Sequence, residues 1–65
     1  SIDERLTLHD FRIVKGPTHT NLIFDVVVPF QFRMTDRQLV QEITRLVQAD
    51  HPNFFTVIEV DKQYY

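Results

Sequence analysis

Residues 21–29, with the sequence NLIFDVVVP, constrain the fold of this 65-residue chain more than any other segment. The segment contains Ile23, Phe24 and three successive valines, which are residue types that suit a pleated and largely buried strand. Pro29 lacks a backbone donor and therefore ends the pairing. Side chains alternate between the two faces of a strand, so both faces are apolar here: Leu22, Phe24, Val26 and Val28 on one, Ile23 and Val27 on the other.

A second candidate strand lies earlier in the chain, from Leu6 to Val14. It is rich in leucine, phenylalanine, isoleucine and valine with polar residues between them, and it stops at Lys15-Gly16-Pro17. The connection from Lys15 to Thr20 contains a glycine, a proline and two threonines. These features predict an antiparallel hairpin whose loop is longer than two residues.

A helix is predicted after a linker at Phe30 to Met34. Thr35 and Gln38 stand at the spacing of a capping box, in which each side chain satisfies a free backbone donor of the other residue. Pro52 stops the helix at about Asp50. Apolar residues recur within it at a 3.6-residue period and form one stripe: Leu39, Val40, Ile43, Leu46 and Val47.

The last predicted strand runs from Phe54 to Asp61, which makes the order β-β-α-β. One of its faces carries Thr56, Ile58 and Val60, and the other becomes acidic at Glu59 and Asp61. The sequence does not determine which edge of the hairpin this strand joins.

The single predicted helix covers only one face of such a sheet. The other face must meet a missing element, a partner chain or solvent, at a cost of ~25 cal/mol per Å² of exposed apolar surface. A different interpretation is that valines on an exposed face are merely tolerated strand formers.

Composition excludes several classes of function. The net charge is −2 and the basic residues are scattered, so we do not expect a nucleic-acid partner. There is no cysteine for a disulfide or a thiolate zinc site. The only serine is Ser1 and the only glycine is Gly16, so neither a nucleophilic triad nor a phosphate loop is recognisable, and we predict that the chain is not an enzyme. The nine residues from Leu22 to Phe30 are too short to insert into a bilayer, where a helix needs ~20.

Four short motifs along the chain resemble one known family. They are His9-Asp10-Phe11-Arg12, Gly16-Pro17, Asp50-His51-Pro52 and Val57-Ile58-Glu59-Val60-Asp61. In this order they resemble the cytoplasmic C-terminal domain of cation diffusion facilitator transporters, a family of metal-efflux membrane proteins. The resemblance covers nearly the whole chain.

The resemblance implies an α+β, ferredoxin-like (metallochaperone-like) α-β-β-α-β domain that forms a homodimer. This chain matches its last four elements and lacks the first helix, apart from that helix's last residues in Ser1 to Arg5. Residues 1–65 would then be a fragment, as the absence of an initial methionine also indicates. The implied function is that of a non-catalytic regulatory and homodimerisation domain of a divalent cation efflux transporter. It would lie at the cytoplasmic face of the cell membrane and act on the transmembrane domain of its parent.

Relatives in this family bind regulatory zinc through histidines that correspond to Phe24, Arg37 and Glu59 here. The residues that remain are His9, Glu59 and Asp61, so the resemblance implies weak or no binding of zinc or another divalent metal. Nitrogen and oxygen ligands of this kind suit zinc, manganese or iron. The same residues also fit a solvated strand end at which His9 caps the hairpin.

Two other functions stay open from the sequence. The chain could be a free-standing ferredoxin-like domain that binds a small ligand or a partner protein, which predicts a parent gene without transmembrane segments upstream of Ser1. An enzyme fragment is the third interpretation, and it requires catalytic groups from elsewhere in the parent chain. His19 and His51 are interpreted as a loop residue and a helix C-terminal residue.

Overall fold

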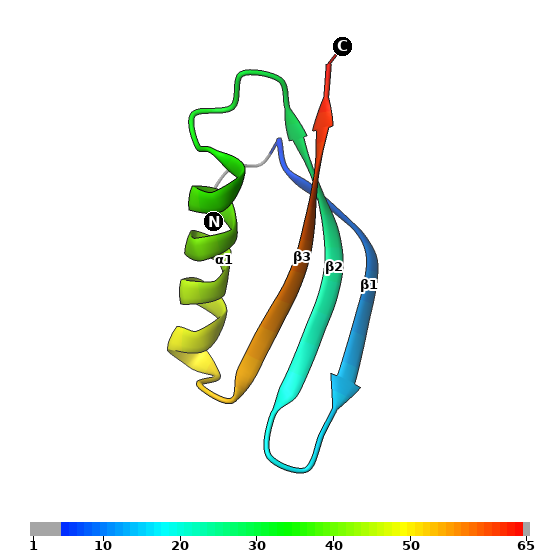
Figure 1. The fold of residues 1–65 in the computed structure, drawn as a ribbon, viewed down its shortest axis with the longest axis vertical. Coiled ribbons are helices and arrows are strands. Elements are labelled where there is room, and N and C mark those ends of the chain that lie inside the picture. Colours follow the sequence, from blue (N-terminus) through cyan, green and yellow to red (C-terminus); the bar gives the residue numbers. More distant parts are fainter. Residues whose placement is uncertain (1–4, 65) are drawn as a thin grey trace.

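A computed structural model describes residues 5–64 and contains three strands and one helix in the predicted order (Figure 1). The α+β, β-β-α-β prediction is therefore confirmed. Of the predicted helix end at Ser1 to Arg5, residues 1–4 lie outside the described residues and Arg5 lies in a turn. Within the described part of the chain, no helix is long and apolar enough to cross a membrane. The elements are β1 (Thr7–Lys15), β2 (Thr20–Pro29), α1 (Asp36–Asp50) and β3 (Phe54–Gln63).

Strand β2 occupies the middle of the sheet. It pairs antiparallel with β1, as the hairpin prediction requires, and the backbone N–H of Gly16 closes the loop by donating to the carbonyl of His19 at 2.8 Å. On its other edge β2 pairs with β3 in parallel. Parallel neighbours need a crossover connection, and α1 provides it. The structure thus decides the edge that the sequence leaves open.

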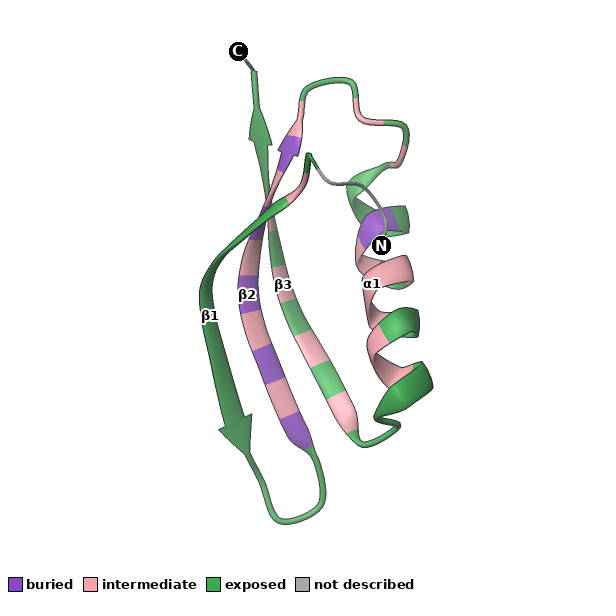
Figure 2. Ribbon diagram, turned by 180° about the vertical axis from the view of Figure 1, so that it is seen from behind, coloured by how far each residue is buried: buried purple, intermediate pink, exposed green. Residues whose placement is uncertain are grey.

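The core lies between β2 and the helix. The residues of β2 alternate between buried and half-buried along its whole length, as Figure 2 shows in purple and pink. Val26, Val28 and Leu39 are almost fully buried and pack together. The predicted apolar face of β2 is therefore the face that the helix covers.

Helix α1 begins and ends where the sequence predicts. The hydroxyl of Thr35 accepts from the backbone N–H of Gln38 at 3.1 Å, and the side-chain oxygen of Gln38 accepts from the backbone N–H of Thr35 at 2.9 Å. The helix ends at Asp50, and the N–H of His51 donates to the carbonyl of Val47 at 3.0 Å. The capping box is confirmed.

Strand β1 is left uncovered by the helix. Every residue of β1 is exposed, and α1 approaches β3 rather than β1 (Figure 2). A helix about 10 Å wide spans only about two strands at ~4.8 Å spacing. The helix therefore buries part of one sheet face, and apolar residues of β1 such as Leu8, Phe11 and Ile13 stay about half exposed.

Two leucines on α1 provide a matched test of this core. Leu39 is 1% exposed and Leu46 is 42% exposed. We expect Leu39→Ala to lower the free energy of unfolding by about 3 kcal/mol, because it removes contacts and leaves a cavity beside Val26 and Val28. Leu46→Ala should cost less than about 1 kcal/mol. Urea denaturation followed by circular dichroism measures both, and equal losses would contradict the packing described here.

Candidate functional site

A bulge interrupts the pairing of β1 with β2. His9 lies opposite Asp25 and Arg12 lies opposite Ile23, so two residues of β1, Asp10 and Phe11, occupy the space of one. Asp10 has a φ of 56°, in the left-handed region. Aspartate tolerates that region better than most residues, and a left-handed residue is one way in which an extra residue is inserted into an antiparallel pair.

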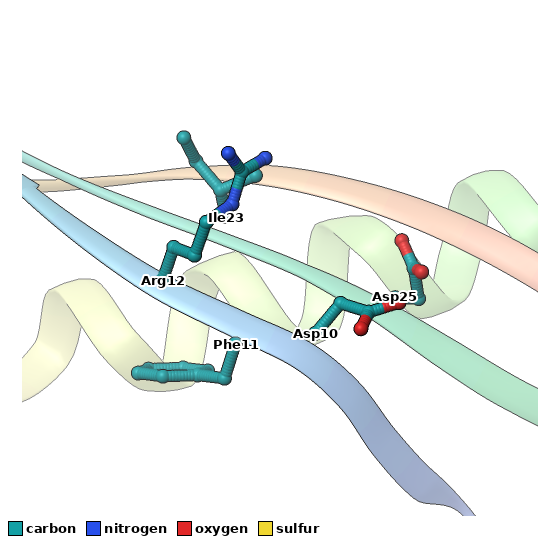
Figure 3. Close-up of a pocket in the computed structure, with 5 residues that line it drawn as sticks. All are labelled: Asp10, Phe11, Arg12, Ile23 and Asp25. Atoms are coloured by element: carbon teal, nitrogen blue, oxygen red, sulfur yellow. The ribbon is translucent and has the colours of Figure 1, made fainter.

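The bulge changes which face Arg12 occupies. In a regular strand, residues three apart such as His9 and Arg12 lie on opposite faces, and one inserted residue brings them to the same face. Figure 3 shows Arg12 and Asp25 projecting from one side of the sheet, while Phe11 projects from the other side, toward α1. The ring of Phe11 stacks on that of Phe24 with centroids 5.7 Å apart. We call the side away from α1 the open face.

The open face carries the predicted metal ligands together with one residue that the sequence analysis missed. His9, Asp25 and Glu59 lie side by side across β1, β2 and β3, and Asp61 lies in the next row of the same face. The missed residue is Asp25, at the centre of the row. Its only signal in the sequence is that it is the one charged residue in a strand of mostly apolar residues.

These residues have suitable donor chemistry for zinc or manganese, but they are not gathered at coordinating distance in a single chain. Among residues 5–64, no three histidine, aspartate or glutamate side chains form a group that could hold a metal ion. The His9 ring Nε2 is instead hydrogen-bonded to the hydroxyl of Thr7 at 3.1 Å. The metal site at His9, Glu59 and Asp61 stays a prediction.

Negative charge accumulates at the centre of the row. Partial desolvation raises the pKa of Asp25, and its hydrogen bond with the carboxyl of Asp10 raises that pKa further. The charges of Asp10 and Asp61 act in the same direction, while His9 opposes them. Desolvation and the neighbouring acids together outweigh the opposing effect of His9 on the pKa of Asp25.

A hollow of about 450 Å³ lies over the bulge. Its walls are Asp10, Phe11, Arg12, Ile23 and Asp25, drawn in Figure 3. The guanidinium of Arg12 stands above Ile23 at one end, and the two carboxyl groups stand at the other end. The hollow therefore presents a positive end and a negative end on one face of the sheet.

The rest of the open face is apolar toward the hairpin end. Val14 and Phe55 flank Asn21 in one row, and Ile23 lies beside Val57 in the next. Val14, Phe55 and Val57 are each about half exposed. We call Val14, Ile23, Phe55 and Val57 the apolar half of the open face.

A second uncovered surface lies on the helix side of the sheet, over β1. It is a groove of about 290 Å³ lined entirely by apolar side chains. They come from all three neighbouring elements and include Leu8 and Phe11 of β1, Phe24 and Val26 of β2, and Ile43 and Val47 of α1. This groove is the part of the helix-facing side that α1 does not fill.

The two other histidines lie at the hairpin end of the molecule. The ring of His19 packs against Phe55 at 5.0 Å, and that of His51 stacks on Phe54 at 4.4 Å. His19 is in the loop between β1 and β2, and His51 is the C-cap of α1. Both positions agree with the sequence interpretation, and neither histidine belongs to the row of His9.

Comparison with family models, with curated proteins and with solved structures finds no match to this chain. The likeness to the cation diffusion facilitator domain therefore depends on the four motifs. In the structure, they lie at the bulge of β1, in the hairpin turn, at the end of α1 and along β3.

The charge of Asp25 gives a test of the electrostatics of the open face. Because its pKa is raised above the ordinary value of 3.8, the folded protein binds this proton more tightly than the unfolded chain does. Stability is therefore lost as the pH rises from about 3.8 through the raised pKa. We expect Asp25→Asn to be more stable than the wild type at neutral pH and equally stable below pH 3.8. Urea unfolding at the two pH values measures this, and a variant that is less stable at neutral pH would contradict it.

Proposed function

We propose that this chain is a non-catalytic cytoplasmic domain that regulates and dimerises a divalent cation efflux transporter, with weak or no metal binding of its own. Its fold in the parent protein is the ferredoxin-like α-β-β-α-β arrangement, of which residues 5–64 supply the last four elements. The proposal joins the resemblance of the four motifs to two uncovered apolar surfaces on the sheet.

The observation that carries the proposal is the apolar half of the open face. No element of the described chain packs over it. Phe55 is 50% exposed and Val57 is 55% exposed. Contiguous exposed apolar surface on a small domain typically marks a protein contact. A second copy of the domain placed against this face removes that surface from water.

The groove on the helix side supports the predicted missing helix. It has an apolar floor on β1 and β2 and an apolar wall on α1. A second helix lying beside α1 and over β1 fits such a groove, and it brings the sheet to the two-helix cover of the α-β-β-α-β fold. The open face then remains the surface for the second copy.

In this proposal the domain acts through the relative position of two paired copies. Pairing or loosening of the two domains moves the transmembrane helices attached to them, and a ligand that binds one arrangement better shifts the population toward it. A divalent metal bound near His9, Asp25, Glu59 and Asp61 is one such ligand, because it offsets the negative charge of the row.

Sedimentation equilibrium of the 65-residue chain tests the pairing. We expect a concentration-dependent dimer that Val57→Asp dissociates, because the variant places a charge in the apolar half of the open face. Ile13→Asp is the matched control, since Ile13 is 58% exposed against 55% for Val57 but lies on the helix side. A wild-type chain that stays monomeric at millimolar concentration would overturn the proposed dimerisation. Dissociation by Ile13→Asp alone would place the contact on the helix side of the sheet instead.

An amide NMR titration with zinc and then manganese tests the metal binding. We expect saturable shifts only in the millimolar range, confined to the row of His9, Asp25 and Glu59 and to Asp61. His19 and His51 serve as internal controls, because they lie at the hairpin end of the molecule. Tight binding in the micromolar range, or shifts centred on the control histidines, would contradict a weak site on the open face.

A further inference from the structure

Arg12 is a cation without a carboxylate partner among residues 5–64. Lys62 pairs with Asp36 at 3.2 Å, and Arg45 pairs with Glu42 on the helix. Arg12 forms no such pair within the described residues, although it is exposed on the same face as Asp25. Its guanidinium is therefore available to a group outside this part of the chain.

The acidic end of the same hollow also lacks a basic partner. No lysine or arginine in the described part of the chain pairs with the carboxyl groups of Asp10 and Asp25. Instead the two carboxyl groups lie close enough for Asp10 to raise the pKa of Asp25. The open face thus carries a cation and an acid pair at opposite ends of one hollow, and neither is neutralised by another described residue.

A surface with both groups is complementary to a second copy of itself. In a two-fold contact both copies use the same patch, so Arg12 of each copy can meet the acid pair of the other copy. An axis that lies between two sheets, crosses their strands obliquely near Ile23 and Val57, and passes between Arg12 and the acid pair keeps these apolar residues of both copies together. It places each Arg12 over the acid pair of the other copy. An axis along the row of Arg12 itself would instead stack the two Arg12 side chains on each other.

The opposite orientation is disfavoured by charge. An axis parallel to the strands would place the row of His9, Asp25 and Glu59 directly over the same row of the second copy. That arrangement places Asp25 over Asp25 of the second copy and brings Arg12 over Val57 rather than over the acid pair, and a contact between like charges is costly at an interface. The pattern of charges therefore selects one of the two orientations.

We infer that Arg12 of one copy binds the Asp10 and Asp25 carboxyl pair of a second copy, and that this exchanged contact orients the two open faces. The inference rests on the proposed pairing through the open face. It adds a contact in which arginine donates from its planar guanidinium to two acids. The bulge makes this contact possible, since it alone brings Arg12 to the acidic face.

Charge reversal in the 65-residue chain tests the contact. Arg12→Glu alone sets a new carboxylate against the acid pair of the other copy, and Asp25→Arg alone sets a new guanidinium against Arg12. We expect each variant to raise the dissociation constant of the dimer by roughly tenfold or more. In a mixture of the two, both exchanged contacts regain opposite charges, so we expect a heterodimer with close to wild-type affinity. Sedimentation velocity with one variant fluorescently labelled measures all three.

Two further variants separate the contact from effects on folding and net charge. Arg12→Gln is a milder change at an exposed position, and it should weaken the dimer and reduce its dependence on salt. Lys15→Glu is the matched control, because it makes the same change of charge on β1 as Arg12→Glu but pairs with the buried Thr20 on the helix side. It should leave the dissociation constant within about threefold of the wild type.

The outcomes distinguish the two proposals. A wild-type dimer that Arg12→Gln and Arg12→Glu leave unchanged overturns the Arg12 contact and leaves dimerisation standing. Weakening by both charge reversals without recovery in the mixture also overturns the contact. A chain that never dimerises overturns the proposed function and the inference together.

Discussion

Strand β2 is paired with β1 along one edge and with β3 along the other, and its side chains at Phe24, Val26 and Val28 are almost fully buried. Every other element is attached to this strand. The hairpin brings β1 to it, and the crossover through α1 brings β3 to it and lays Leu39 on its apolar face. In a domain of this size, which buries only about 60% of its unfolded surface, a strand that is hydrogen-bonded on both sides and covered on one face supplies most of the core.

The bulge of β1 gives the open face its chemistry. Without the extra residue, His9 and Arg12 would lie on opposite faces of the sheet. With it, Arg12 shares a face with Asp25 and Glu59, while Phe11 stays on the helix side and stacks on Phe24. A single inserted residue thus serves both the packing of the helix side and the arrangement of charge on the other side.

The two uncovered surfaces have different character. The groove over β1 is entirely apolar, as expected of a site for another element of the same protein. The open face combines an apolar half with a row of charged residues, as in contacts between separate folded domains, where a polar rim surrounds an apolar centre. This difference is the physical reason for proposing a helix as the occupant of the groove and a second copy as the occupant of the open face.

Local patterns in the sequence determined the elements themselves. The β-branched run of β2, the Gly16-Pro17 turn, the capping box at Thr35 and the stop at Pro52 each act through nearby residues, and the structure confirms all four. The residues that sit beside His9 could not be predicted in this way. The position of Asp25 between His9 and Glu59 depends on the parallel pairing of β2 with β3, and the position of Arg12 depends on the bulge. Both are set by contacts between segments far apart in the chain, which only the tertiary structure decides, because the register of a strand is chosen by its partners and not by its own residues alone.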